Sequence, residues 1–134
     1  MAKQFGLGKK ERLKSRKQID SLFAGGKSFA AFPLRVVYRF ESPAETPGIR
    51  VGVTAPKKHF KKAVDRNRIK RLLREAYRLQ KTGLTEAALH GGKAANVFFM
   101  YTDKSLPLFE TVQPAMARCI LHLQQKLKSH EALA

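Results

Sequence analysis

The most regular pattern of apolar and polar positions lies in residues 64–80 and is typical of a helix with two unlike faces. At about 100° per residue, apolar side chains gather on one arc and basic or amide side chains on the opposite arc. The apolar arc holds Ile69, Leu72, Leu73, Ala76 and Tyr77, and the opposite arc holds Asn67, Lys70, Arg71, Arg74 and Arg78. The pattern predicts a helix with one face in the core and one face that is almost wholly cationic.

Residues 34–40 and 49–55 alternate between apolar and polar side chains, which predicts two half-buried strands. The first strand directs three side chains away from its apolar face: Arg35, Val37 and Arg39. We expect the two strands to pair antiparallel. Pro56 ends the second strand, because proline cannot donate to a sheet ladder.

Two further helices are predicted toward the ends of the chain. Ser15 and Gln18 form a capping box at the start of a short helix, which Gly25-Gly26 ends with a left-handed residue. A last helix covers about 113–128, with Pro114 in its first turn. Its apolar stripe consists of Met116, Cys119, Ile120, Leu123 and Leu127.

The continuous apolar run 94–101 predicts a buried strand, and the pattern allows a short extra strand near 28–29. The resulting order αβ(β)βαβα predicts an α+β fold, a single-domain sandwich with a mainly antiparallel sheet and helices on one face. We assign residues 15–129 to this domain, residues 1–14 to a flexible basic arm and residues 130–134 to a C-terminal tail.

The net charge restricts the possible classes of function more than any other property of the composition. Among 134 residues, 27 are Lys or Arg and 10 are Asp or Glu, for a net charge of +17. Seven basic residues lie within 1–17 and ten within 57–78. A compact protein with this excess repels itself, so the working partner is expected to be a polyanion, with nucleic acid ahead of a membrane surface.

Other classes of chemistry find little support. Gly26-Lys27-Ser28 resembles the tail of a phosphate-binding loop, but Ser21 stands where that motif needs a glycine. Cys119 is the single cysteine and lies on an apolar stripe, so no disulfide, zinc site or thiol nucleophile is expected. No apolar run approaches the ~20 residues of a membrane span, and the start of the chain lacks a signal-peptide core, so we expect a cytoplasmic protein without a membrane partner.

The basic helix and its surroundings resemble a known family. Residues 61–77 are similar to the Arg-Asn-Arg signature of the bacterial ribonuclease P protein subunit, with the core Arg66-Asn-Arg-Ile-Lys-Arg-Leu72. The resemblance runs from Arg12 to Leu127, and further matches follow in order: Arg12-Leu-Lys with Phe23, Gly26-Lys27-Ser28, Arg50-Val-Gly-Val and Lys57-Lys58.

The resemblance implies a subunit of an RNA-based endonuclease, inactive alone, that binds the catalytic RNA of ribonuclease P and the 5′ leader of precursor tRNA. Magnesium, held mainly by the RNA, would carry out the leader removal, and no obligate protein partner is expected. The family fold also implies a left-handed βαβ crossover through the signature helix. A ribosomal or general RNA-binding protein without a processing role is the alternative that the composition allows.

The resemblance also implies functional residues at the positions that match the family's motif. Those expected to face the RNA subunit are Arg66, Asn67, Arg68, Lys70, Arg71 and Arg74. The leader would lie between the first helix and the uncovered sheet face, on Phe23, Arg35, Val37, Arg50, Gly52, Thr54, Lys57, Lys58 and Lys62. Ile19 stands where the family commonly has an aromatic residue. Phe23 has two interpretations, a leader contact or a core side chain.

Overall fold

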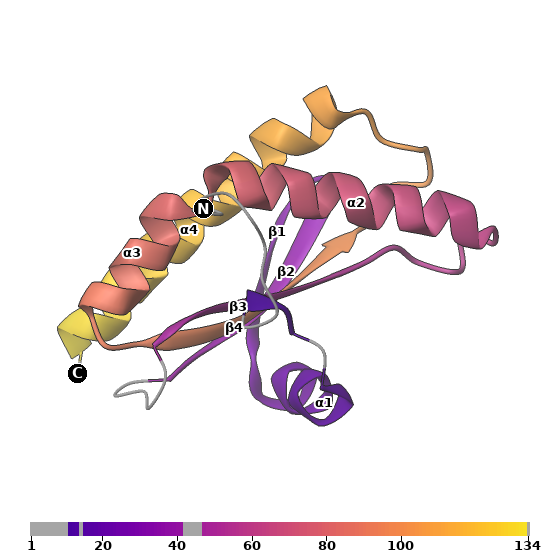
Figure 1. The fold of residues 1–134 in the computed structure, drawn as a ribbon. Coiled ribbons are helices and arrows are strands. Elements are labelled where there is room, and N and C mark those ends of the chain that lie inside the picture. Colours follow the sequence, from indigo (N-terminus) through magenta and orange to yellow (C-terminus); the bar gives the residue numbers. More distant parts are fainter. Residues whose placement is uncertain (1–10, 14, 42–46, 134) are drawn as a thin grey trace, which may run out of the picture.

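Four helices and one four-stranded sheet make up the part of the chain that the structure describes (Figure 1). This computed structural model describes residues 11–13, 15–41 and 47–133. The elements are α1 Arg16–Gly25, β1 Lys27–Ala31, β2 Leu34–Glu41, β3 Gly48–Thr54, α2 Ala63–Gln80, α3 Thr82–His90, β4 Ala94–Tyr101 and α4 Phe109–Leu133. All the predicted helices and strands are present, the short extra strand included, and α3 was not predicted.

The strands are ordered β1-β2-β4-β3. The β1–β2 and β2–β4 pairs are antiparallel, whereas β3 and β4 are parallel. The prediction that β2 pairs with β3 is wrong, because β4 lies between them. The apolar β4 thus obtains a partner on each edge, and α2 with α3 supplies the long connection that a parallel pair requires.

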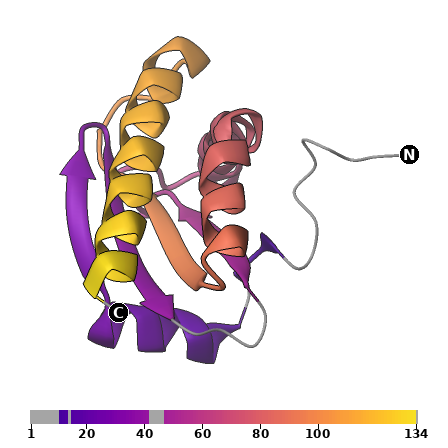
Figure 2. The ribbon, with the colours of Figure 1, turned by 90° about the vertical axis from the view of Figure 1, so that its left-hand side faces the viewer.

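Helix α4 packs beside α2 and α3, which follow one another along the chain, and the three helices cover one face of the sheet (Figure 2). The buried positions of β2, Leu34, Val36 and Tyr38, face this layer, as the alternation predicts. On α2, Ile69 and Leu73 are fully buried. The predicted apolar stripe of α4 is buried as well, so the amphipathic patterns place both helices correctly.

Helix α1 is the exception to the one-faced arrangement, because it packs on the opposite face of the sheet. Leu22 of α1 forms a small second cluster with Leu13 and Val37, against which Phe98 and Met100 also pack. Alternation puts Val37 on the polar side of β2, yet its side chain is only 7% exposed, because α1 covers it. The second face is therefore partly buried.

The structure confirms the predicted start of α1 but not the predicted conformation at its end. Ser15 Oγ accepts a hydrogen bond from the Gln18 backbone N at 3.3 Å, which confirms the helix start. The left-handed stop is wrong, since Gly26 has an extended backbone with φ −83° and ψ 164°. Glycine is needed there for space instead, because a Cβ on Gly26 would lie 2.5 Å from the carbonyl oxygen of Leu22.

Helix α4 begins four residues earlier than predicted. The backbone N–H groups of Thr111 and Val112 donate to the carbonyl oxygen of Leu108, which starts the helix ahead of Pro114. Pro114 consequently lies inside the helix and not in its first turn. The exposed ring of Pro114 removes the N–H that would otherwise bond to Glu110, so the first turns of α4 lack one backbone bond.

Candidate nucleic-acid interface

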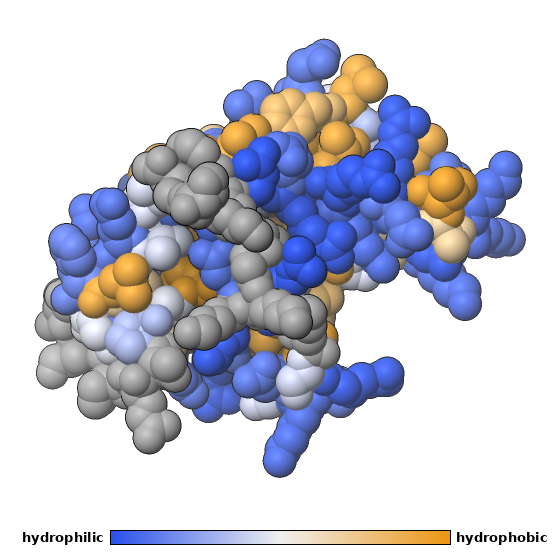
Figure 3. Space-filling view, in the orientation of Figure 1, coloured by the Kyte–Doolittle hydropathy of each residue, from blue (hydrophilic) through white to orange (hydrophobic). Residues whose placement is uncertain are grey.

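The cationic face of α2 borders a groove of about 470 Å³, which we call the α2 groove. Figure 3 shows hydrophilic side chains gathered along this face. The groove is lined by Arg12, Asn67, Lys70, Arg71, Arg74, Glu75 and Arg78. Burial of Ile69 and Leu73 fixes the helix about its axis, so these polar side chains point outward from a rigid support.

Charge in the α2 groove is strongly one-sided. Five of the lining side chains are basic, and Glu75 is the only acidic one. Glu75 accepts a hydrogen bond from Arg78, its neighbour three residues along the helix. The groove therefore keeps an excess of positive charge. This charge suits a row of phosphates, since arginine can hold two phosphate oxygens at once.

Four of the six residues assigned to the RNA subunit line the groove together: Asn67, Lys70, Arg71 and Arg74. The other two lie elsewhere on the helix. Arg66 donates through Nη1 to the carbonyl oxygens of Phe60 at 2.7 Å and Lys61 at 2.9 Å, so it anchors the loop before α2. Arg68 is exposed on a flank about a third of a turn from Arg74.

Arg12 lines the groove from outside α2, and the sequence prediction did not assign it there. The prediction placed it in a flexible arm, of which the structure describes residues 11–13. Leu13 donates its backbone N–H to the carbonyl oxygen of Val51 at 2.9 Å and is 5% exposed. Arg12 forms an isolated parallel bridge with Val51 beside β3. Leu13, an apolar residue in a basic stretch, was the available signal.

Helix α1 divides the second sheet face into two ends. Val37 and Gly52 pair with Phe98 in the row beneath the helix, and Gly52 leaves room for the Phe98 ring, which a Cβ would approach to 2.5 Å. Arg35 and Thr54 pair with Met100 at one end of the face. Arg50 lies at the other end, so the predicted leader residues do not form one continuous set.

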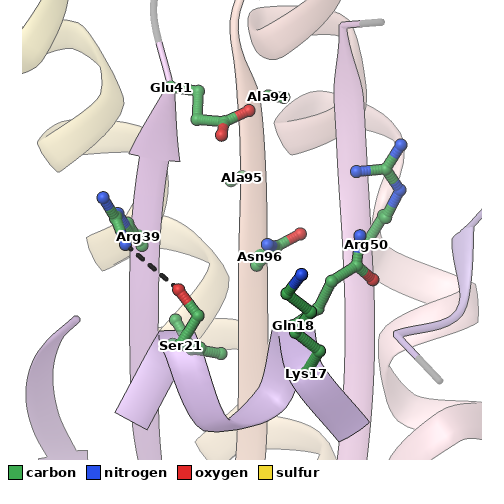
Figure 4. A pocket seen from close by; sticks show the side chains of 10 residues that line it. Lys17, Gln18, Ser21, Arg39, Glu41, Arg50, Ala94, Ala95 and Asn96 are labelled. Atoms are coloured by element: carbon green, nitrogen blue, oxygen red, sulfur yellow. Dashed lines mark hydrogen bonds between the residues drawn. The ribbon is translucent and has the colours of Figure 1, made fainter. Parts of the chain in front are cut away.

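The Arg50 end holds a polar pocket of about 430 Å³ between α1 and the sheet (Figure 4). Lys17 and Ser21 line it from the helix, and Arg50 lines it from β3. Arg39 Nη1 donates to Ser21 Oγ at 3.4 Å. The rest of the lining consists of Gln18, Leu22, Glu41, Ala94, Ala95 and Asn96.

Phe23 lies at the edge of the helix, where its ring packs edge-on against Phe98 with centroids 5.3 Å apart. Its side chain is 46% exposed, so it is not a core residue. Arg35 is exposed, whereas Val37 is buried and does not offer its side chain to a ligand.

The loop between β3 and α2 leaves the sheet at its Thr54 end. Lys57, Lys58 and Lys62 are all exposed on it. Phe60 is 5% exposed and packs against Tyr101, with ring centroids 6.0 Å apart, so it ties the loop to the core. The backbone N–H of Phe60 also donates to the Pro56 carbonyl oxygen at 3.0 Å. The loop that carries the three lysines therefore begins beside Thr54, at the end of the face that also holds Arg35.

Groups for catalysis are scarce. Burial raises the pKa of the Cys119 thiol to about 12, so it stays protonated at neutral pH. Across the described ranges, no three His, Cys, Asp or Glu side chains gather to hold a metal ion. Within the same ranges, no helix is long and apolar enough to cross a membrane. The fold and the groove define a small basic α+β protein with a cationic helix on its surface, a feature typical of proteins that bind polyanions.

Comparisons with known proteins identify the family. Residues 7–119 match the family model for ribonuclease P. The ribonuclease P protein component of Porphyromonas gingivalis is 42% identical over 93% of this chain and 91% of its own length. The ribonuclease P protein of Thermotoga maritima superposes with a TM-score of 0.65 at 25% identity, over 84% of this chain and 96% of that one. The chain belongs to the ribonuclease P protein component family.

Membership confirms the resemblance to this family and the α+β fold. Members are components of an endoribonuclease, and membership implies association with the ribonuclease P RNA. It therefore favours a subunit of that enzyme over a ribosomal or general RNA-binding protein.

Proposed function

We propose that this chain binds the catalytic RNA of ribonuclease P through the α2 groove and the 5′ leader of precursor tRNA on the second sheet face. Binding promotes the magnesium-dependent removal of the leader, in the cytoplasm. The observation that carries the first contact is the α2 groove itself, where five basic side chains surround one carboxylate already engaged by Arg78. Arginines carried on a packed helix bind phosphate without the cost of first ordering their backbone.

The leader is assigned to the end of the second face that holds Phe23, Arg35 and Thr54. An exposed aromatic ring supported from below by Phe98 is a platform on which an unpaired base can stack. The adjacent loop carries three exposed lysines that would meet the phosphates: Lys57, Lys58 and Lys62. Arg50, in the pocket beyond α1, would contact a more distant part of the leader.

Magnesium is assigned to the RNA subunit, where it supplies the hydroxide and the charge stabilisation for phosphodiester hydrolysis. The described residues do not fit a magnesium centre, since their carboxylates are dispersed. This chain contributes binding and orientation of the two RNAs.

The proposal is tested by the salt dependence of binding to a ribonuclease P RNA transcript. Removing the side chain that neutralises one phosphate should flatten the log–log slope by roughly 0.7 to 0.9. Replacing Lys70, Arg71 and Arg74 with alanine should therefore reduce the slope by about two to three units. The control replaces Lys104, Lys126 and Lys128, three exposed lysines away from the groove. Equal slopes for the two folded variants would refute the groove as the RNA contact.

A further inference from the structure

A partly buried ion pair links the start of the described chain to the junction of α2 and α3. Lys81 is 5% exposed, and its Nζ donates to both carboxylate oxygens of Glu11, at 2.8 and 2.6 Å. The carbonyl oxygen of Lys81 also accepts the backbone N–H of Thr85 at 2.9 Å. The lysine is therefore fixed by its own backbone, and the pair joins residues that are distant in sequence.

The segment that Glu11 holds is the one that carries Arg12 into the α2 groove. On one side of Arg12 the Glu11 carboxylate is tied to Lys81, and on the other side Leu13 is buried and bonded to Val51. Arg12 itself is exposed and lines the groove opposite the α2 side chains. Both neighbours of this arginine are anchored, so the backbone from which it reaches the groove is held in place.

We propose that the Glu11–Lys81 pair is a positioning device for RNA binding, which orders Arg12 before the RNA arrives. The inference rests on the proposed function of the α2 groove. An arginine on an unattached segment would lose backbone freedom when it bound a phosphate, and this loss would reduce the affinity. The ion pair removes most of that loss in advance.

The direction in which one substitution changes RNA affinity distinguishes this positioning role from a simple effect of charge. Glu11→Gln removes a negative charge from a protein that binds a polyanion, so charge alone predicts tighter RNA binding. Positioning predicts weaker binding, by about three- to tenfold, the loss expected for one charge-assisted contact. Glu86→Gln on the exposed face of α3 makes the same change of charge outside the groove and should bind at least as tightly as the parent.

The experiment measures affinity for a ribonuclease P RNA transcript and the melting temperature of each variant. Glu11→Gln should weaken binding in the parent but have no further effect in an Arg12→Ala background. The exchange Glu11→Lys with Lys81→Glu, which keeps the net charge, should restore affinity. Tighter binding by Glu11→Gln, or an equal loss with and without Arg12, would overturn the proposal.

Failure of the groove itself would give a different result. In that case Arg71→Ala and Arg74→Ala would leave RNA affinity and its salt slope unchanged, and the proposed function would fall together with the positioning role. If those two variants weaken binding while Glu11→Gln strengthens it, only the positioning role is refuted. The arms of the experiment therefore distinguish the two failures.

Discussion

Single side chains in this protein take roles that the sequence pattern alone does not decide. Arg66 belongs to the same motif as Arg71, yet Arg66 anchors the loop before α2, whereas Arg71 lines the groove. Val37 occupies a surface position in the alternating pattern of its strand and is buried. In each case the outcome depends on a neighbour from another element, which periodicity does not report.

Substitution of Phe23 tests the proposed leader contact directly. Phe23→Ala should weaken binding of precursor tRNA to the assembled enzyme by about 1 to 3 kcal/mol for each stacked base. Mature tRNA, which lacks a leader, should bind as before. Arg35→Ala should show the same selectivity, and Phe23→Tyr, which keeps an aromatic face, should retain most of the affinity.

The measurement compares the affinities of both tRNAs and the melting temperature for each variant. Equal losses for precursor and mature tRNA with an unchanged melting temperature would exclude a leader site beside Phe23. A lower melting temperature with equal losses would instead assign the ring to packing on Phe98 alone.

At the scale of elements, the strongest periodicities were predicted well. The observed bounds of α2 and β4 differ from the predicted bounds by no more than one residue. Helix α2 has a long amphipathic pattern, and β4 is a continuous apolar run. Helix α3 was missed, since only Leu84 and Ala88 are buried along it, too few for a clear period. Strand pairing failed because alternation predicts strands but not their neighbours.

Pro114 inside α4 offers a prediction about stability. Pro114→Ala restores a backbone donor and should raise the free energy of unfolding by about 1 to 3 kcal/mol, since proline in a helix interior costs roughly 3 kcal/mol relative to alanine. Urea titration of the free protein measures the change. Gln125→Ala, an exposed position of the same helix with its N–H in place, should have little effect. Unchanged stability in Pro114→Ala would mean that α4 accommodates the ring without cost.

For the whole molecule, the candidate interface was only partly predictable. The α2 face follows from one helix, but the groove also needs Arg12 from the other end of the domain, and a sequence read segment by segment does not join them. The leader residues were divided because the sheet register and the placement of α1 decide which of them lie together. Long-range pairing is the information that local patterns lack.

Cleavage assays with the protein alone and with a ribonuclease P RNA test which of the two carries out catalysis. Protein purified free of nucleic acid should not cleave precursor tRNA, because its described residues include no metal-binding cluster and its thiol is protonated. Adding a ribonuclease P RNA should give magnesium-dependent cleavage that the protein accelerates. Cleavage by the protein alone would reveal an active site, and an unchanged rate with RNA would favour a general RNA-binding role.

The central place of β4 bears on how the chain folds as it leaves the ribosome. β4 is the last strand to be synthesised, yet it pairs with both β2 and β3. Until it emerges, β3 lacks its strand partner in the sheet and β2 pairs only with β1. The sheet can therefore close only late in translation, and the apolar sides of β2 and β3 wait uncovered until then. A strongly positive nascent chain repels its own copies during this interval, so we expect the net charge to oppose aggregation of the unfinished sheet.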